Sequence, residues 1–302
     1  MTIKLAVQFV VLAALWGASF LFMRLGAGDF GPVATAGLRV GLAALVLLPL
    51  LLLYEVRVDF WRWRFQIMLI GLISSAIPFT LYSYAVLMIP TSVAAIINAT
   101  VPLVGAMIAW VWLQDRPDGT RLLGLMIGFV GVALLVLGKA SVDASGQPTD
   151  GIRPETLVAM AAAFGAIVCY GIAANATRRY LRNVHSMAVA TGSQIGAALG
   201  LLVPTIWFWP STAPGMTAWL AVIALAVLGT ALAFLLFFNL IARIGPTRAL
   251  TVTFLVPVFA VIYAAVFLNE RITLWMLVWG GVILLGTALS AGLWRLRRSS
   301  TV

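Results

Sequence analysis

Proline stands at matching positions in two similar stretches of this chain, VPLVGAMIAWVWLQDR and, 155 residues later, VPVFAVIYAAVFLNER. Pro102 and Pro257 lack an N–H, so in each expected helix the carbonyl four residues earlier loses its hydrogen-bond partner. Those carbonyls belong to Asn98 and Thr253, whose side chains are also polar. One interpretation is that carbonyl and side chain line a path for a small polar solute. The other is a pair of packing kinks whose side chains satisfy their own backbone.

A second set of candidates consists of aromatic and polar side chains inside apolar segments. Trp16 matches Tyr170 at a spacing of 154, and Tyr84 matches Asn239 at 155. Such a set suits a roomy, mostly apolar cavity with a few hydrogen-bonding groups, although ordinary helix packing accounts for any single aromatic. The candidate substrate-binding residues are Trp16, Arg39, Tyr82, Asn98, Tyr170, Gln194, Asn239 and Thr253, with Pro102 and Pro257 as kink or gating positions.

Arg39 is the only charged residue well inside an expected helix, about 12 Å from its outer end at ~1.5 Å per residue. An ionisable group within a membrane span suggests a function by default. It would either attract a substrate carboxylate or brace the fold by pairing with carbonyls or with Glu270, because the arginine fork serves both purposes. At a spacing of 154 its partner in the other half is Ser193, so the repeat is not symmetric there.

Acidic residues and histidine are absent from the interior of the expected spans. All nine acids lie at helix ends or in loops, and the single histidine, His185, opens a helix. Intramembrane catalysis needs a nucleophile with a base or a metal-binding cluster of acids. We therefore expect no metal, no cofactor and no enzymatic activity.

The composition indicates what kind of chain positions these residues. Hydrophobic residues make up 63% and charged residues 9%, against roughly 45–50% and about 25% in soluble domains. Apolar runs near 20 residues long recur, enough to cross a ~30 Å hydrocarbon layer. The sequence predicts an all-α polytopic membrane protein. The formal charge of +10 comes from cations scattered singly between these runs, so no nucleic-acid partner is expected.

Ten transmembrane helices are expected, in two groups of five. Their ranges are 3–25, 31–53, 65–88, 91–113, 119–138, 155–180, 185–208, 215–241, 246–268 and 274–294. The polar stretch at 139–154 is a linker between a first five-helix repeat, 1–138, and a second, 155–302.

Lysine and arginine predict the orientation. With the N-terminus, the even-to-odd loops and the C-terminus on one side, that side holds fourteen cations against four on the other. The positive-inside rule then places both termini in the cytoplasm. After five crossings the second repeat enters from the opposite face, so the two halves are inverted copies. This architecture is typical of secondary transporters, whose site lies at the repeat interface near the midplane.

Small residues recur on two of the expected helices. Gly124 and Gly128 form a GxxxG pattern, and Gly286 lies on the last helix. Such faces let helices approach closely. Packing within one chain is the expectation, with a monomer or a weak dimer as the assembly.

LWGASFLFMR, GLRVGLAALVLLPLLL and both proline-containing stretches resemble the EamA-type branch of the drug/metabolite transporter superfamily and, within it, YddG-type amino-acid exporters. The resemblance spans both repeats. It implies a multi-pass inner-membrane exporter of small amphipathic metabolites, amino acids with aromatic or apolar side chains included, working by alternating access around a central cavity. Drug or toxic-compound efflux and a passive channel are the alternatives. The implied partners are a small-molecule substrate and membrane lipids. The family's helix-two arginine and its acidic helix end correspond to Arg39 and Glu270.

Overall fold

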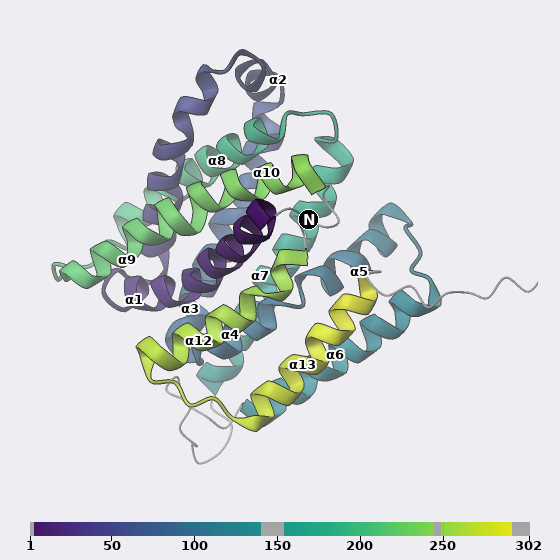
Figure 1. Ribbon diagram of the computed structural model, residues 1–302. Helices are drawn as coiled ribbons and strands as arrows, with labels where there is room; N and C mark the ends of the chain where they lie inside the picture. The colour runs from purple at the N-terminus through teal and green to yellow at the C-terminus, as the bar shows by residue number, and fades with distance from the viewer. Residues whose placement is uncertain (1–2, 140–153, 245–248, 250, 292–302) are drawn as a thin grey trace, which may run out of the picture.

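The computed structural model describes residues 3–139, 154–244, 249 and 251–291, and within them all regular structure is helical (Figure 1). The expected linker, 139–154, lies almost wholly outside these residues. The elements are α1 (Ile3–Leu47), η1 (Leu48–Leu52), α2 (Tyr54–Gly71), η2 (Leu72–Ala76), α3 (Ile77–Met88), α4 (Thr91–Asn98), α5 (Val101–Leu113), α6 (Gly119–Lys139), α7 (Pro154–Tyr180), α8 (Ser186–Trp207), α9 (Met216–Ala226), η3 (Val227–Leu232), α10 (Ala233–Ile244), η4 (Thr251–Phe254), α12 (Val256–Leu268) and α13 (Leu274–Ser290).

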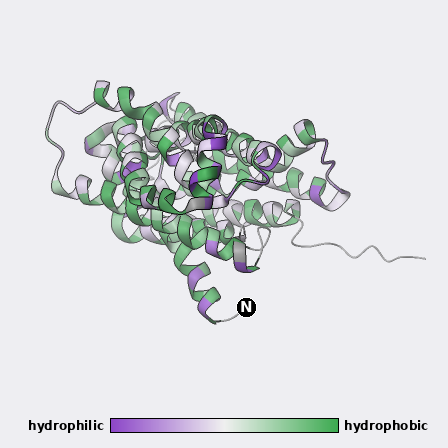
Figure 2. Cartoon of the chain, turned by 90° about the horizontal axis from the view of Figure 1, so that it is seen from above, coloured by the Kyte–Doolittle hydropathy of each residue, from purple (hydrophilic) through white to green (hydrophobic). Residues whose placement is uncertain are grey.

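The helices carry apolar side chains on their outer faces. In the described part of the chain, eight helical segments are long and apolar enough to cross a membrane, and a further apolar helix, α13, is shorter. Hydrophobic residues dominate the helices (Figure 2). Large side chains such as Val203 and Trp207 are 67% and 81% exposed, which hydrocarbon tolerates and water disfavours. The protein is an all-helical membrane protein.

α1 replaces two helices that were expected to be separate, 3–25 and 31–53. Its helical conformation is interrupted at Gly31, whose φ of 74° and ψ of 168° favour glycine. The Arg39 guanidinium lies 3.5 Å from the Met23 sulfur, whereas sixteen residues of straight helix would separate them by about 24 Å. α1 therefore consists of two antiparallel arms that fold back at Gly31.

The helix expected across 91–113 is also two elements. α4 ends at Asn98, and α5 begins at Val101 with Pro102 in its second position. α12 likewise begins at Val256 with Pro257 second. Proline is well suited to the first turn of a helix, where its missing N–H leaves no bond unmade. Both prolines thus start new helices instead of bending continuous ones, which corrects the expectation of mid-helix kinks.

Local backbone features recur at the repeat spacing. The π-helical segments η2 and η3 begin at Leu72 and Val227, which are 155 residues apart. α5 and α12 both end in a left-handed residue, Gln114 and Asn269, at the same spacing. Because turns and bulges of this kind depend on local sequence, their recurrence is what a duplicated chain would produce.

Helices from the two sequence halves pack against each other at small residues. Gly17 on α1 lies against Ala260 of α12, and Gly171 on α7 lies against Gly105 of α5. A methyl group at Gly17 or Gly171 would overlap the facing helix. The first helix of each half thus packs against the helix of the other half that begins with the proline.

α6 and α13 form a further close pair, visible side by side in Figure 1. Gly124 and Gly128 of α6 contact Gly286 and Ser290 of α13 closely enough that no Cβ would fit at Gly124 or Gly286. The GxxxG face is therefore occupied within the chain.

Candidate functional site

Three of the expected site residues meet in the centre of the molecule, and each comes from a different helix. The Tyr82 hydroxyl on α3 donates a hydrogen bond of 3.0 Å to Asn98 Oδ1 at the end of α4. The Tyr82 ring stacks on that of Tyr170 from α7, with centroids 6.2 Å apart, and Phe20 of α1 packs edge-on at 5.6 Å. Tyr82 is buried, whereas Asn98 and Tyr170 are half-buried. We call these four residues the central cluster.

Trp16 borders the central cluster without stacking on its expected partner, Tyr170. Its ring contacts Phe237 of α10, with centroids 5.2 Å apart. Half-buried, it packs against apolar residues of the central core and of the α1–α10 contact. The symmetric spacing of Trp16 and Tyr170 is therefore not matched by a ring contact between them.

Arg39 is almost fully buried, with 6% of its surface exposed. Its Nε donates a hydrogen bond of 2.9 Å to Thr230 Oγ1 in η3, and its guanidinium lies 3.5 Å from the centre of the Phe79 ring. It is within electrostatic range of Tyr170. Among the described residues no ion pair includes Arg39. The expected brace between Arg39 and Glu270 is not observed.

Gln194 makes the same contact in the other half. Its Nε2 donates a hydrogen bond of 2.9 Å to Ser75 Oγ in η2. Ser75 and Thr230 each occupy the fourth position of a π-helical segment. Arg39 therefore corresponds to Gln194, not to Ser193, which corrects the register inferred from the sequence. Gln194 is fully buried in this contact.

The remaining candidates lie apart from these contacts. Asn239 is exposed and accepts hydrogen bonds from Gln8 and Arg243, at 3.3 and 3.2 Å. Thr253 is half-buried in η4. Asn239 thus belongs to the edge of the molecule, where α1 and α10 meet, and not to the central cluster.

Glu270 follows α12 and closes one end of the seam between the halves. Its carboxylate accepts hydrogen bonds from the Thr91 and Ser92 amides at 2.6 and 3.0 Å and from the Ser92 hydroxyl at 2.6 Å. The amides belong to the first turn of α4, where the helix dipole favours an anion. Arg24, in electrostatic range of Glu270, donates to the carbonyl of Val86. The end of α12 is thereby tied to the start of α4.

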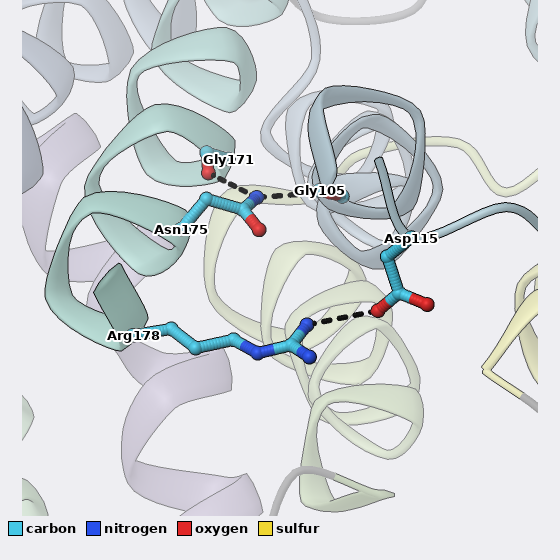
Figure 3. Close-up of polar contacts among 5 residues, drawn as sticks. All are labelled: Gly105, Asp115, Gly171, Asn175 and Arg178. Atoms are coloured by element: carbon cyan, nitrogen blue, oxygen red, sulfur yellow. Dashed lines mark hydrogen bonds and ion pairs between the residues drawn. The ribbon is translucent and has the colours of Figure 1, made fainter. Parts of the chain in front are cut away.

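Asp115 follows α5 as Glu270 follows α12, but it makes a different contact. It forms an ion pair of 3.0 Å with Arg178 of α7, in which both side chains are well exposed. One turn earlier on α7, Asn175 donates hydrogen bonds of 2.9 Å to the Gly105 and Gly171 carbonyls (Figure 3). One end of the seam is thus held by the buried Glu270 network, and the other by an exposed ion pair together with the Asn175 hydrogen bond to Gly105.

Some residues of these networks escaped the sequence interpretation. Thr230 and Phe79 carried no signal of their own, because a hydroxyl and a ring in an apolar run are ordinary. Asn175, Arg24 and Arg178 do have a signal in the sequence: Asn175 is a polar residue within a span, and Arg24 and Arg178 match at a spacing of 154.

Comparison with known proteins agrees with this architecture. The family model described as the EamA-like transporter family matches residues 4–137 and again residues 157–292. The uncharacterized transporter YdfC of Bacillus subtilis (strain 168) is 24% identical over 290 residues, covering 94% of this chain and 90% of YdfC. The uncharacterized inner membrane transporter YedA of Escherichia coli (strain K12) is 28% identical over 251 residues, covering 82% and 78%.

A solved structure, described only as the crystal structure of a protein, superposes on this chain with a TM-score of 0.66. The two share 21% identity over 97% of this chain and 98% of the other. At that identity the likeness shows a common fold.

Proposed function

The chain belongs to the EamA-like transporter family, and from that premise we propose that it exports small amphipathic solutes bearing a carboxylate, amino acids with aromatic or apolar side chains among them. The family is one of transporters and not of enzymes. The proposed cargo is a small molecule that moves by alternating access between the two halves.

The charge of Arg39 is the observation that carries this proposal. A buried cation is costly unless an anion or several hydrogen bonds compensate it. The hydrogen bond itself does not require a charge, since Gln194 makes the same contact with a neutral amide. What Arg39 adds is a positive charge beside Tyr170, and a solute carboxylate is the partner that such a charge favours.

The central cluster supplies the complementary apolar surface. A solute whose carboxylate approaches Arg39 would bring its side chain toward Tyr170 and Tyr82, which stack on each other. Asn98 and Tyr170 are half-buried and offer an amide and a ring face. Apolar contact discriminates weakly between similar side chains, so the proposed specificity is broad.

The proposed topology has ten crossings in two inverted repeats, 1–138 and 155–302. The two antiparallel arms of α1 account for two of the crossings, because Gly31 divides a helix far longer than one span. Glu270 at the end of α12 lies at the start of α4, as an inverted arrangement requires. The cation count supports cytoplasmic termini, and an inner-membrane location is supported by the description of YedA.

The two ends of the seam are proposed gates. In this topology Glu270 faces outward and Asp115 faces the cytoplasm. Removing one partner from a buried charged network typically costs about 3–5 kcal/mol, whereas an exposed ion pair such as Asp115–Arg178 contributes roughly 0.2–1 kcal/mol. In the proposed cycle this conformation is sealed more firmly at the outer end than at the cytoplasmic end, where the solute enters.

Counterflow in proteoliposomes tests the proposal. Wild-type protein should exchange labelled phenylalanine saturably, which separates a carrier from an open channel. Arg39→Gln keeps a donor for Thr230 and should lower phenylalanine exchange at least about tenfold, the loss of one charge-assisted hydrogen bond, while leaving phenylalaninamide exchange unchanged.

Arg62→Gln, which removes an exposed cation, is the matched control. Arg39→Gln protein that exchanges phenylalanine at the wild-type rate would contradict the role of the charge. The absence of counterflow for every amino acid tested would contradict the proposed cargo.

A further inference from the structure

A groove on the side of the molecule, between the start of α1 and α10, is lined by polar side chains in one part and apolar side chains in the other. It has a volume of about 470 Å³ and is open to the outside. Lys4, Gln8 and Asn239 are its polar lining, and the rest is apolar: Val7, Val11, Leu235 and Leu236. The groove is independent of the central cluster and of the identity of the solute.

The two helices run antiparallel along the groove, so its polar groups are ordered by depth. Gln8 Nε2 donates to the Leu236 carbonyl at 2.9 Å and to Asn239 Oδ1 at 3.3 Å, which fixes the register. Lys4, one turn before Gln8, then lies toward the Arg243 end of α10, and Val11 lies toward the Leu235 end. From Lys4 to Val11 the groove descends about 10 Å at ~1.5 Å per residue.

Along the groove, the cationic side chains thus lie at its outer edge, the side-chain amides of Gln8 and Asn239 one turn deeper, and the apolar side chains deepest. Lys4 and Arg243 are both exposed. Arg243 Nε donates to Oδ1 of the groove-lining Asn239 at 3.2 Å, which places the Arg243 side chain next to the groove. No carboxylate lines the described part of the groove.

We propose that this groove binds one anionic phospholipid from the leaflet on the side of the N-terminus. The phosphate would lie between Lys4 and Arg243, the ester groups level with Gln8 and Asn239, and the start of an acyl chain on Val7 and Val11, which are 56% and 40% exposed. Charge complementarity and the polar-to-apolar order both match such a lipid. The positive-inside rule places this end at the cytoplasmic face, where basic residues near the surface attract anionic lipid.

Native mass spectrometry of the full chain in neutral detergent tests this assignment, with dioleoylphosphatidylglycerol and dioleoylphosphatidylcholine as the two probes. Wild-type protein should retain the first lipid preferentially. The double variant Lys4→Gln/Arg243→Gln should bind it roughly 10- to 30-fold more weakly, since each surface cation accounts for about a fivefold change. Arg62→Gln/Arg182→Gln, which removes two exposed cations elsewhere, should bind like wild type.

Val11→Trp provides a second measurement, because it fills the apolar part of the groove without changing charge. It should also weaken phosphatidylglycerol retention. Equal retention of the two lipids by wild type, wild-type affinity in the Lys4/Arg243 variant, or an equal loss in the control pair would overturn the proposal. So would full competition by soluble glycerophosphoglycerol, because the site would then recognise a free phosphate and not a lipid.

Discussion

Arg39 and Gln194 donate matching hydrogen bonds in the two halves of the protein. Each reaches, at 2.9 Å, a hydroxyl at the fourth position of a π-helical segment, Thr230 in one case and Ser75 in the other. The contact is part of the duplicated fold, and only one copy carries a charge. Bracing and solute recognition, which the sequence offered as alternatives for Arg39, are thus compatible: the hydrogen bond to Thr230 serves bracing, and the charge is left for the proposed recognition of the solute.

Thr230→Val should destabilise the protein more than Ser75→Ala does. It leaves the Arg39 Nε–H buried without its acceptor, which costs about 1.5–3 kcal/mol for a charged donor, against about 1 kcal/mol for the neutral amide of Gln194. Thermal unfolding of the two variants in detergent measures the difference. Equal losses of stability would mean that the charge of Arg39 is not buried in this contact.

Asn98→Ala should lower solute exchange without lowering membrane abundance, since Asn98 is half-buried and bonded to Tyr82 in the central cluster. Tyr82→Phe, which removes the hydrogen bond to Asn98 but keeps the stack, should have a smaller effect, about fivefold in apparent affinity for ~1 kcal/mol. Thr253→Ala tests the other half of the repeat. Initial rates are compared at equal protein, judged by immunoblot, and wild-type exchange by both alanine variants would remove these residues from the path.

Glu270→Gln should loosen the proposed outer gate. The amide group that replaces one carboxylate oxygen cannot accept from Thr91 or Ser92, a loss of about 1.5–3 kcal/mol that favours the open form roughly 10- to 100-fold. A cysteine at buried Val93, in a Cys169→Ser background, should then react faster with an impermeant maleimide added outside.

Asp115→Asn is the matched control for that measurement. It breaks the exposed pair with Arg178 at the other end of the seam and should leave labelling at Val93→Cys unchanged or slower. Unchanged labelling in Glu270→Gln would show that the Glu270 network does not hold the gate closed.

Gly286→Ala should destabilise the α6–α13 pair by about 1–3 kcal/mol, because its Cβ would overlap the Gly128 backbone. Gly281→Ala, on the same helix but facing open space, is the control and should not lower stability. Unfolding temperatures in detergent check both variants. If Gly286→Ala instead changed only the oligomeric state, the glycine face would serve association between chains.

Much of the architecture could be predicted from the sequence, because hydropathy and charge act through sums over local residues. A run of apolar residues must be helical in hydrocarbon wherever it stands. The spacing between the proline stretches revealed the duplication, and the stretches around Trp16, Arg39 and Glu270 indicated the family that the family model shows. No local sequence pattern indicated that the Glu270 carboxylate accepts hydrogen bonds from Thr91 and Ser92.

Contacts between helices depended on rotation and register, which only the tertiary structure decided. The repeat spacing is 154 in the first helix of each half and 155 beyond it, and the sequence did not show where the extra residue falls. A slip of one residue turns a side chain by about 100° around a helix. A spacing of 154 pairs Arg39 with Ser193, whereas the contacts in the structure pair it with Gln194. The same dependence brought Tyr82, Asn98 and Tyr170 together and left Asn239 at the edge of the molecule, since the side of a helix that meets a neighbour depends on how all the helices pack.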